Sequence, residues 1–153
     1  MIALTAVFLT GTASVFAGSY KQGEPMDSFQ AKDQHGAVYD FQPIRVKYLL
    51  VSHDMDTGKK ANVALTELGK DFLPRHGAVY LANIHGMPAI GRRFALPKMK
   101  KYLHRIVLGD DTSLMERFPQ EAGKVTVIGI SGGKVRSIRY WSPGTESVGD
   151  YLK

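Results

Sequence analysis

The chain has 153 residues, of which 44% are apolar, and it carries a formal charge of +6 with no cysteine. This length supports one domain with a single hydrophobic core. The absence of cysteine excludes disulfide bonds, thiolate catalysis and a cysteine-linked lipid anchor. The moderate basic excess favours solubility and attraction to anionic surfaces.

The segment Met1–Ala17 contains no charged residue and closes with Val15-Phe16-Ala17, which fits the cleavage pattern of a secretory signal peptide. The basic region that usually opens such a peptide is missing. A membrane anchor is the competing interpretation, but the Thr, Ser and Gly content makes a poor spanning helix. We therefore expect a cleaved signal peptide at 1–17, a single domain at 18–153 and a periplasmic or secreted protein. Nucleic acid is a poor candidate partner for an exported protein.

The first half of the chain predicts a hairpin, a strand, a helix and a second strand. The hairpin strands are expected at Phe29–Ala31 and Val38–Phe41. A continuous apolar run at Tyr48–Val51 is typical of a strand buried on both faces, and Ala78–Ile84 is a second such run. Apolar residues between them recur at intervals of three and four, as in a helix: Ala61, Leu65, Leu68 and Phe72. This alternation predicts a parallel strand pair with a right-handed crossover.

The second half predicts another helix after Gly86-Met87-Pro88, in which Pro97 introduces a kink or a break. Its apolar side is expected to face the core through Ile90, Phe94, Met99 and Leu103. The later elements are a strand at His104–Leu108, a short helix at Ser113–Phe118, strands at Val125–Ile130 and Val135–Trp141, and a final helical turn at Glu146–Leu152. Asp110-Asp111-Thr112 stand where they can cap the short helix. Ser131-Gly132-Gly133-Lys134 is a strong hairpin signal between the last two strands.

This order of elements resembles the thioredoxin-like fold, and specifically its peroxiredoxin-like and cytochrome-maturation branch. The opening Phe29-x-Ala31-x-Asp33-x-x-Gly36 also resembles the common start of that branch. The resemblance covers nearly all of Met26–Lys153. It implies a three-layer α/β/α domain with a central mixed sheet and an N-terminal β-hairpin.

The sequence departs from that branch at both landmarks of its thiol chemistry. The redox motif would fall near His53–Lys59, where no residue can replace a thiolate. A cis-proline usually precedes the strand equivalent to Val125–Ile130, and Gly123-Lys124 stand there instead. The resemblance therefore implies the fold, but not a thiol oxidoreductase activity.

Polar clusters follow the two central strands and form the candidate ligand or metal site. The residues concerned are His53, Asp54, Asp56 and His85. Ligands of parallel α/β sheets gather at the carboxyl ends of the strands, and imidazoles with carboxylates suit a divalent metal or a general base. The alternative is that the carboxylates cap the helix beginning near Thr57 while the histidines lie in solvated loops.

Two acidic motifs also resemble the aspartyl-nucleophile phosphatases of the haloacid dehalogenase type. Asp54-Met55-Asp56-Thr57 resembles their nucleophile motif, and Ile106–Asp111 resembles their late magnesium-holding motif. The resemblance implies a first Asp that attacks phosphorus and a second that acts as acid and base. Thr57 stands one residue earlier than the threonine of that motif.

A basic segment without acidic residues runs from Met87 to Leu108. Its cations form the candidate anion-binding surface, which could contact an anionic ligand or a membrane surface: Arg92, Arg93, Lys98, Lys100 and Lys101. The ordinary alternative is a solvated helix face opposite the apolar stripe.

Three functions are therefore compatible with the sequence. The first is an exported thioredoxin-fold protein without thiol redox activity that acts as a binding or accessory module in the cell envelope, with an envelope protein or an anionic ligand as its partner. The second is a metal-dependent hydrolase or phosphatase built on the four strand-end residues. The third is a structural partner protein that binds through its basic helix, which an exposed apolar patch beside that helix would favour.

Overall fold

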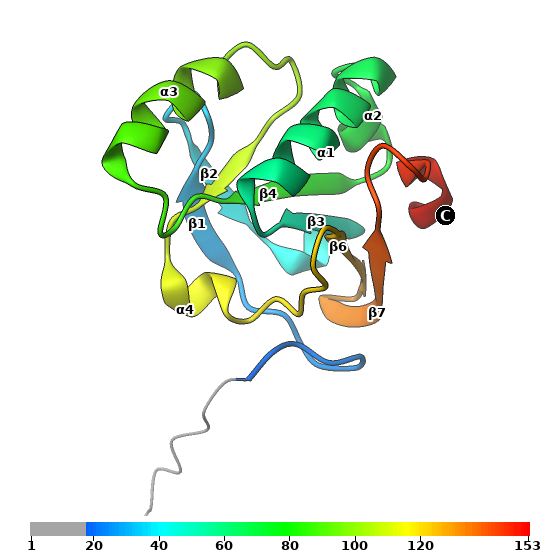
Figure 1. Ribbon diagram of the computed structural model, residues 1–153. Coiled ribbons are helices and arrows are strands. Elements are labelled where there is room, and N and C mark those ends of the chain that lie inside the picture. Colours follow the sequence, from blue (N-terminus) through cyan, green and yellow to red (C-terminus); the bar gives the residue numbers. More distant parts are fainter. Residues whose placement is uncertain (1–17) are drawn as a thin grey trace, which may run out of the picture.

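The computed structural model describes residues 18–153 (Figure 1). The expected signal peptide, Met1–Ala17, lies outside the described residues and stays a prediction. None of the helices between Gly18 and Lys153 combines the length and the apolar character that a bilayer crossing requires.

A five-stranded mixed sheet forms the centre of the domain, with the strand order β5-β4-β3-β6-β7. Its strands are β3 (Tyr48–Ser52), β4 (Ala78–Asn83), β5 (Val107–Gly109), β6 (Val125–Ser131) and β7 (Lys134–Trp141). The first three run parallel to one another, and β6 and β7 pair antiparallel. The sequence predicts this parallel pair and this C-terminal hairpin correctly, because Leu49, Leu50 and Val51 are fully buried and the Gly132-Gly133 turn closes β6 onto β7.

One face of the sheet is covered by helices. They are α1 (Met55–Leu68), α2 (Phe72–Arg75), α3 (Ala89–Met99) and the 3-10 turn η2 (Val148–Tyr151). Ala61 and Leu65 of α1 and Leu73 of α2 pack against the same core as Tyr80 and Trp141. The expected single helical run to Phe72 is interrupted at Gly69, whose φ of 87° is unfavourable for other residues.

The opposite face is covered by the N-terminal hairpin and a short helix. These elements are β1 (Phe29–Lys32), β2 (Val38–Phe41), the 3-10 turn η1 (Pro43–Arg45) and α4 (Thr112–Met115). Phe29 stacks on the fully buried Phe41 with ring centroids 4.6 Å apart. The tip of the hairpin is tied to the chain before β5, because the Gln34 N–H donates to the Ile106 carbonyl at 3.0 Å and the Gln34 side chain accepts from the Ile106 N–H at 2.8 Å. The predicted hairpin and layered architecture are confirmed.

The structure contradicts one prediction in the segment around α3 and decides between two alternatives at Pro97. The expected core stripe is wrong, because Ile90, Phe94 and Leu103 are 70%, 66% and 79% exposed, and no residue of α3 is fully buried. Only Met99 and the following Tyr102 pack against the core. Of the two alternatives expected at Pro97, the break into two helices does not occur, because α3 continues through Pro97 and ends two residues later at Met99.

Candidate functional site

The segment that follows β3 positions the first of the expected site residues. Asp54 is the N-cap of α1: one carboxylate oxygen accepts from the Thr57 N–H at 2.8 Å, and the other accepts from the Thr57 hydroxyl at 2.9 Å. Asp56 is exposed in the first turn, where its charge faces the positive end of the helix dipole. Both carboxylates therefore stabilise the start of α1, which agrees with the capping alternative.

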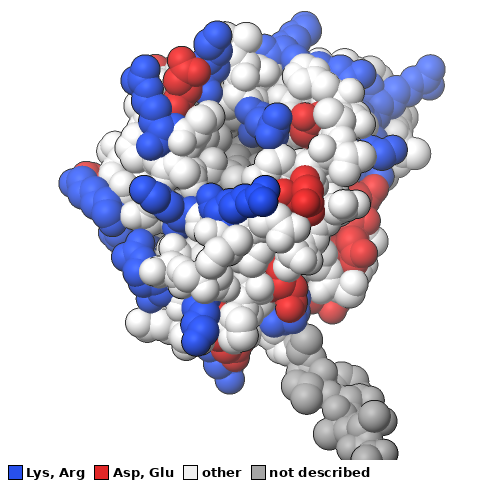
Figure 2. All heavy atoms as spheres, turned by 180° about the vertical axis from the view of Figure 1, so that it is seen from behind, with Lys and Arg blue, Asp and Glu red and all other residues white. Residues whose placement is uncertain are grey.

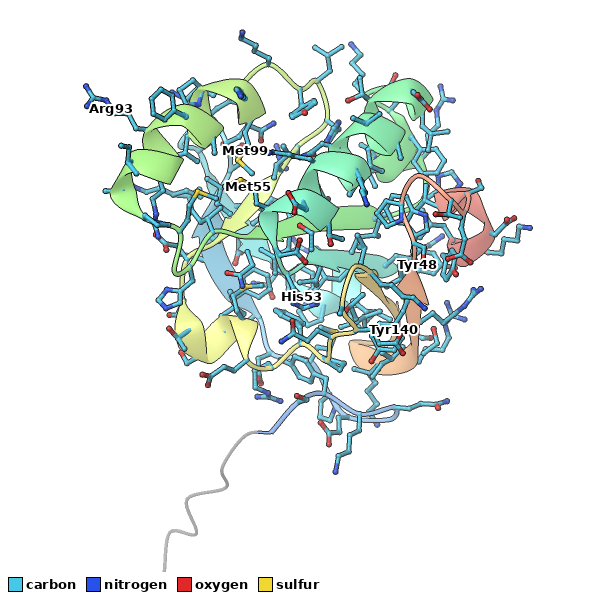
Figure 3. All side chains as sticks on the ribbon, in the orientation of Figure 1. Tyr48, His53, Met55, Arg93, Met99 and Tyr140 are labelled. Atoms are coloured by element: carbon cyan, nitrogen blue, oxygen red, sulfur yellow. The ribbon has the colours of Figure 1, made fainter. Side chains whose placement is uncertain are left out.

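His53 turns away from α1 toward β6 (Figure 3). The Thr126 hydroxyl donates to the Pro119 carbonyl at 2.6 Å, so its oxygen accepts from the Nε2–H of His53 at 2.8 Å. Burial lowers the pKa of His53, and the nearby Asp54 charge opposes this effect. His53 is thus tied to β6 through its side chain.

His85 belongs to a different cluster, beyond the end of β4. Its Nε2 contacts the Thr112 hydroxyl, and its Nδ1 lies 3.9 Å from Asp110. Arg92 binds both oxygens of Asp110 at 2.6 and 2.7 Å, and this hydrogen bonding holds the pKa of Asp110 below its usual range. The cluster joins the start of α3 to the chain after β5.

The structure does not bring the four candidate residues together as one cluster. Within residues 18–153, no group of three or more His, Asp and Glu side chains is placed to hold a metal ion. The reason is geometric: His53 is bound to Thr126 and His85 to Thr112, on different elements. The acidic residues of the phosphatase interpretation have other partners in the structure: Asp54 caps α1, Asp110 is paired with Arg92, and Asp111 caps α4.

A pocket of about 230 Å³ lies at this same end of the sheet, between α1 and α3. We call it the methionine pocket, because methionines from three segments line it: Met55 at the start of α1, Met87 in the loop before α3, and Met99 at the end of α3. Figure 3 shows Met55 and Met99 in the space between the two helices. Phe94 and Tyr102 add aromatic walls.

The polar groups at the base of the methionine pocket are already paired within the protein. The Ser52 and Tyr80 hydroxyls share a buried hydrogen bond of 2.9 Å, and burial raises the pKa of Tyr80. Asn62 pairs through Oδ1 with Nε2 of His104 at 2.9 Å, and burial lowers the pKa of His104 to about 4. Because these groups satisfy one another, the pocket offers a ligand mainly apolar and thioether surface.

Two lysines and one carboxylate, that of Asp54, line the methionine pocket, and the expected anion-binding surface beside it needs one correction. Arg92 is not free to bind a ligand, because its guanidinium binds Asp110 and also donates to the carbonyls of Ile84 and Met87. The other four expected cations are exposed: Arg93, Lys98, Lys100 and Lys101. Lys98 lines the pocket together with Lys59, and Arg93 points outward from α3 (Figure 3).

Sequence reasoning missed the methionine pocket and the buried His104. The sequence pattern assigned only Met99 to the core, and Met99 does pack there. Met55 is 43% exposed and stands within the segment where the resemblance places a redox motif. The position of Met55 in that segment is the sequence feature that could have indicated the pocket. His104 offered none, because its partner Asn62 is 42 residues away in the sequence.

The mixed sheet, the N-terminal hairpin and the helix that starts at the end of β3 define a thioredoxin-like fold, and this chain carries that fold without redox cysteines. No protein-family model matches the sequence. No curated protein matches it either.

Solved structures of similar fold include thiol-disulfide and peroxiredoxin-like proteins. A candidate thiol:disulfide interchange protein (DsbE) from Chlorobium tepidum has a TM-score of 0.61 and 11% identity, over 88% of this chain and 96% of that one. A peroxiredoxin-like protein from Aquifex aeolicus has a TM-score of 0.56 and 13% identity, over 88% and 86% of the two chains. The thioredoxin domain of a thiol-disulfide oxidoreductase from Bacteroides vulgatus has a TM-score of 0.55 and 12% identity, over 88% and 100%. At these identities the likeness shows the fold alone.

Proposed function

We propose that this protein is a binding or accessory module of the cell envelope, which uses a thioredoxin-like fold to hold a partner rather than to exchange disulfides. The methionine pocket carries the proposal, because it lies where the fold would bear its thiols and presents thioethers and aromatic rings instead. The envelope location is supported by the uncharged Met1–Ala17 segment and its cleavage pattern.

The chemistry of the pocket indicates the kind of partner. Met55, Ile90 and Phe94 are large apolar side chains that α1 and α3 leave exposed, and methionine adapts its shape to different apolar ligands. The cations of α3 and of the residues after it lie beside them, in a segment without acidic residues. A partner segment that inserts an apolar side chain and carries carboxylates on either side fits both features. The proposed function therefore combines two of the functions that the sequence allowed, the binding module and the protein that binds a partner through its basic helix.

The packing of α3 supports a binding role. No residue of this helix is fully buried, so little apolar burial holds it against the sheet. The ion pair of Arg92 with Asp110 fixes its first turn, while Phe94 and Met99 line the pocket further along. We infer that the helix can shift about its anchored end and adjust the pocket to a ligand.

Selection from a random peptide library displayed on phage, against the immobilised 18–153 domain, tests the proposal. Enriched peptides should share an apolar residue flanked by Asp or Glu. For the synthesised peptides, Phe94→Ser and Met55→Ser should each weaken binding about tenfold or more, as for a residue at the centre of an interface. Val63→Ser is the matched control, because Val63 is an exposed apolar residue of α1 outside the pocket.

Calorimetry gives the affinities, and NMR shift mapping gives the location. The proposal predicts shifted amides on α1 and α3, with Val63→Ser binding within about twofold of the unmodified protein. Peptides that bind Phe94→Ser and Met55→Ser as tightly as the unmodified protein, or that shift amides elsewhere, would refute it.

A further inference from the structure

A second and larger cavity lies beside the beginning of β4, at the opposite end of that strand from the methionine pocket. Its volume is about 620 Å³, and it is bounded by the hairpin tip, α2, the start of β4 and the chain before β5. Seen from behind, the molecule has a hollow bordered by Lys and Arg side chains (Figure 2). This volume is in the range of ligand-binding cavities.

The wall of this cavity includes an open strand edge. The Tyr48 N–H donates to the Gly77 carbonyl, so the backbone groups of Gly77 and Val79 face β3. Because successive residues of a strand alternate, the backbone N–H and C=O groups of Ala78 and Tyr80 point away from β3. On that side β5 pairs with β4 only from Leu81 onward, where Leu81 lies opposite Val107. The N–H and C=O of Ala78 and the N–H of Tyr80 therefore face the cavity with no strand opposite them.

These three backbone groups favour one kind of occupant. A buried backbone donor or acceptor is costly unless something pairs with it. A free anion could accept from the two N–H groups, but it would face the Ala78 carbonyl oxygen unfavourably. An extended peptide presents donors and acceptors at the spacing of a strand, so it can pair with all three groups, as in binding by strand addition.

The charges around the open edge indicate which peptide. Arg45 and Lys70 line the cavity, and within residues 18–153 neither side chain makes an ion pair or a hydrogen bond. Arg105 lies over the Tyr39 ring, 5.2 Å from its centroid, and only 3.7 Å from a carboxylate oxygen of Asp33. The three cations come from separate segments, and the carboxylates of Asp33 and Asp71 also line the cavity, so the charged lining keeps a small positive excess. This excess complements a peptide that carries carboxylates.

We propose that an extended, acidic peptide segment of a partner protein binds in this cavity by adding to the edge of β4 at Ala78 and Tyr80. Its backbone pairs with these two residues, and its carboxylates meet Arg45, Lys70 and Arg105. The site is separate from the methionine pocket and does not depend on the function proposed for that pocket.

A capped hexapeptide of alternating Glu and Val serves as the probe, titrated into the ¹⁵N-labelled 18–153 domain. The Ala78 and Tyr80 amide signals should shift, and the Tyr80 amide should exchange more slowly with deuterium. Replacing Glu by Lys in the probe should weaken binding at least tenfold. Two further probes carry N-methyl groups on alternate residues, one on the odd-numbered and the other on the even-numbered residues. One of these two should bind at least fivefold more weakly than the unmethylated probe, because its methyl groups block the N–H groups that pair with β4.

The protein variant Arg45→Glu/Lys70→Glu should weaken the Glu-Val probe at least tenfold, and neither side chain holds the fold together through an ion pair. The charge-matched control, Lys21→Glu/Lys134→Glu, alters exposed residues that line neither this cavity nor the methionine pocket, and it should bind within about threefold of the unmodified protein. Equal binding of the Glu and Lys probes would overturn the proposal. It would also be overturned if both methylated probes bound as tightly as the unmethylated probe. Glutarate alone reproducing the Ala78 and Tyr80 shifts at the same concentration would overturn it too, since the site would then take a free anion.

Discussion

Mild acidification should destabilise this protein, because His104 is buried as a neutral imidazole. The side chain is 2% exposed, lies between the rings of Tyr80 and Tyr102, and pairs with Asn62. Burial lowers its pKa to about 4 from an ordinary 6.5. Protonating it in the folded state would place a charge where no carboxylate faces it.

The sign and size of the effect follow from proton linkage. Between pH 6.5 and 4 the unfolded chain binds a proton at His104 that the folded chain does not, so the free energy of unfolding falls as the pH falls through this window. Each pK unit is worth about 1.4 kcal/mol, which gives a loss of about 2 kcal/mol between pH 7 and 5 and about 3 kcal/mol below pH 4. His53 acts in the same direction, because its pKa is also lowered by burial.

Urea unfolding at pH 8, 7, 6 and 5 measures this loss. Trp141 is the single tryptophan and is fully buried, so its fluorescence reports the global transition. His104→Gln keeps a polar group that can pair with Asn62 and removes the titration, and it should abolish most of the pH dependence. His35→Gln is the control, because His35 is exposed in the hairpin turn.

The reasoning is refuted if His104→Gln shows the same loss of stability between pH 7 and 5 as the unmodified protein. Three carboxylates contribute stability that is lost mainly below this window. The pKa values of Asp110, Asp111 and Glu146 are held below their usual range by hydrogen bonds, so the stability they contribute is lost mainly below pH 5.

Two further predictions concern the ends of α1 and α3. Asp54→Ala should lower the free energy of unfolding by about 1 kcal/mol through loss of the N-cap, whereas Asp56→Ala should cost only a few tenths, as measured by urea unfolding. Equal costs would contradict the assigned cap. Arg92→Ala should raise the pKa of Asp110 in an NMR titration and speed amide hydrogen exchange in the loop before α3. Arg93→Ala should change neither, and the anchoring role fails if Arg92→Ala behaves like it.

Local patterns were sufficient for much of the fold. The apolar run at Leu49–Val51 has no polar side to expose, so it predicts a strand covered on both faces. Gly132 and Gly133 both adopt positive φ, which other residues rarely do, so the hairpin between β6 and β7 is visible in the sequence. The cap of α4 lies within Asp110-Asp111-Thr112 as expected, at Asp111, because a cap depends on only a few neighbouring residues.

The candidate site depended on contacts that the sequence does not show. His53 and His85 were grouped because both follow a central strand, but the direction of each side chain is set by a partner far along the chain, Thr126 in one case and Thr112 in the other. Arg92 was grouped with the exposed cations, and only the position of Asp110 distinguishes it from Arg93. Such pairings arise from the packing of whole elements against one another.

The sequence by itself determined that the protein has no thiol chemistry, because a covalent sulfur intermediate needs an atom that the chain lacks. It also determined the order in which strands and helices follow one another along the chain, since this order follows from the spacing of apolar residues and the positions of glycines. Only the tertiary structure decided that Phe94 is exposed while His104 is buried. Burial is a relation between a side chain and whatever covers it, and the periodicity of one segment shows an apolar face without showing whether another segment lies against it.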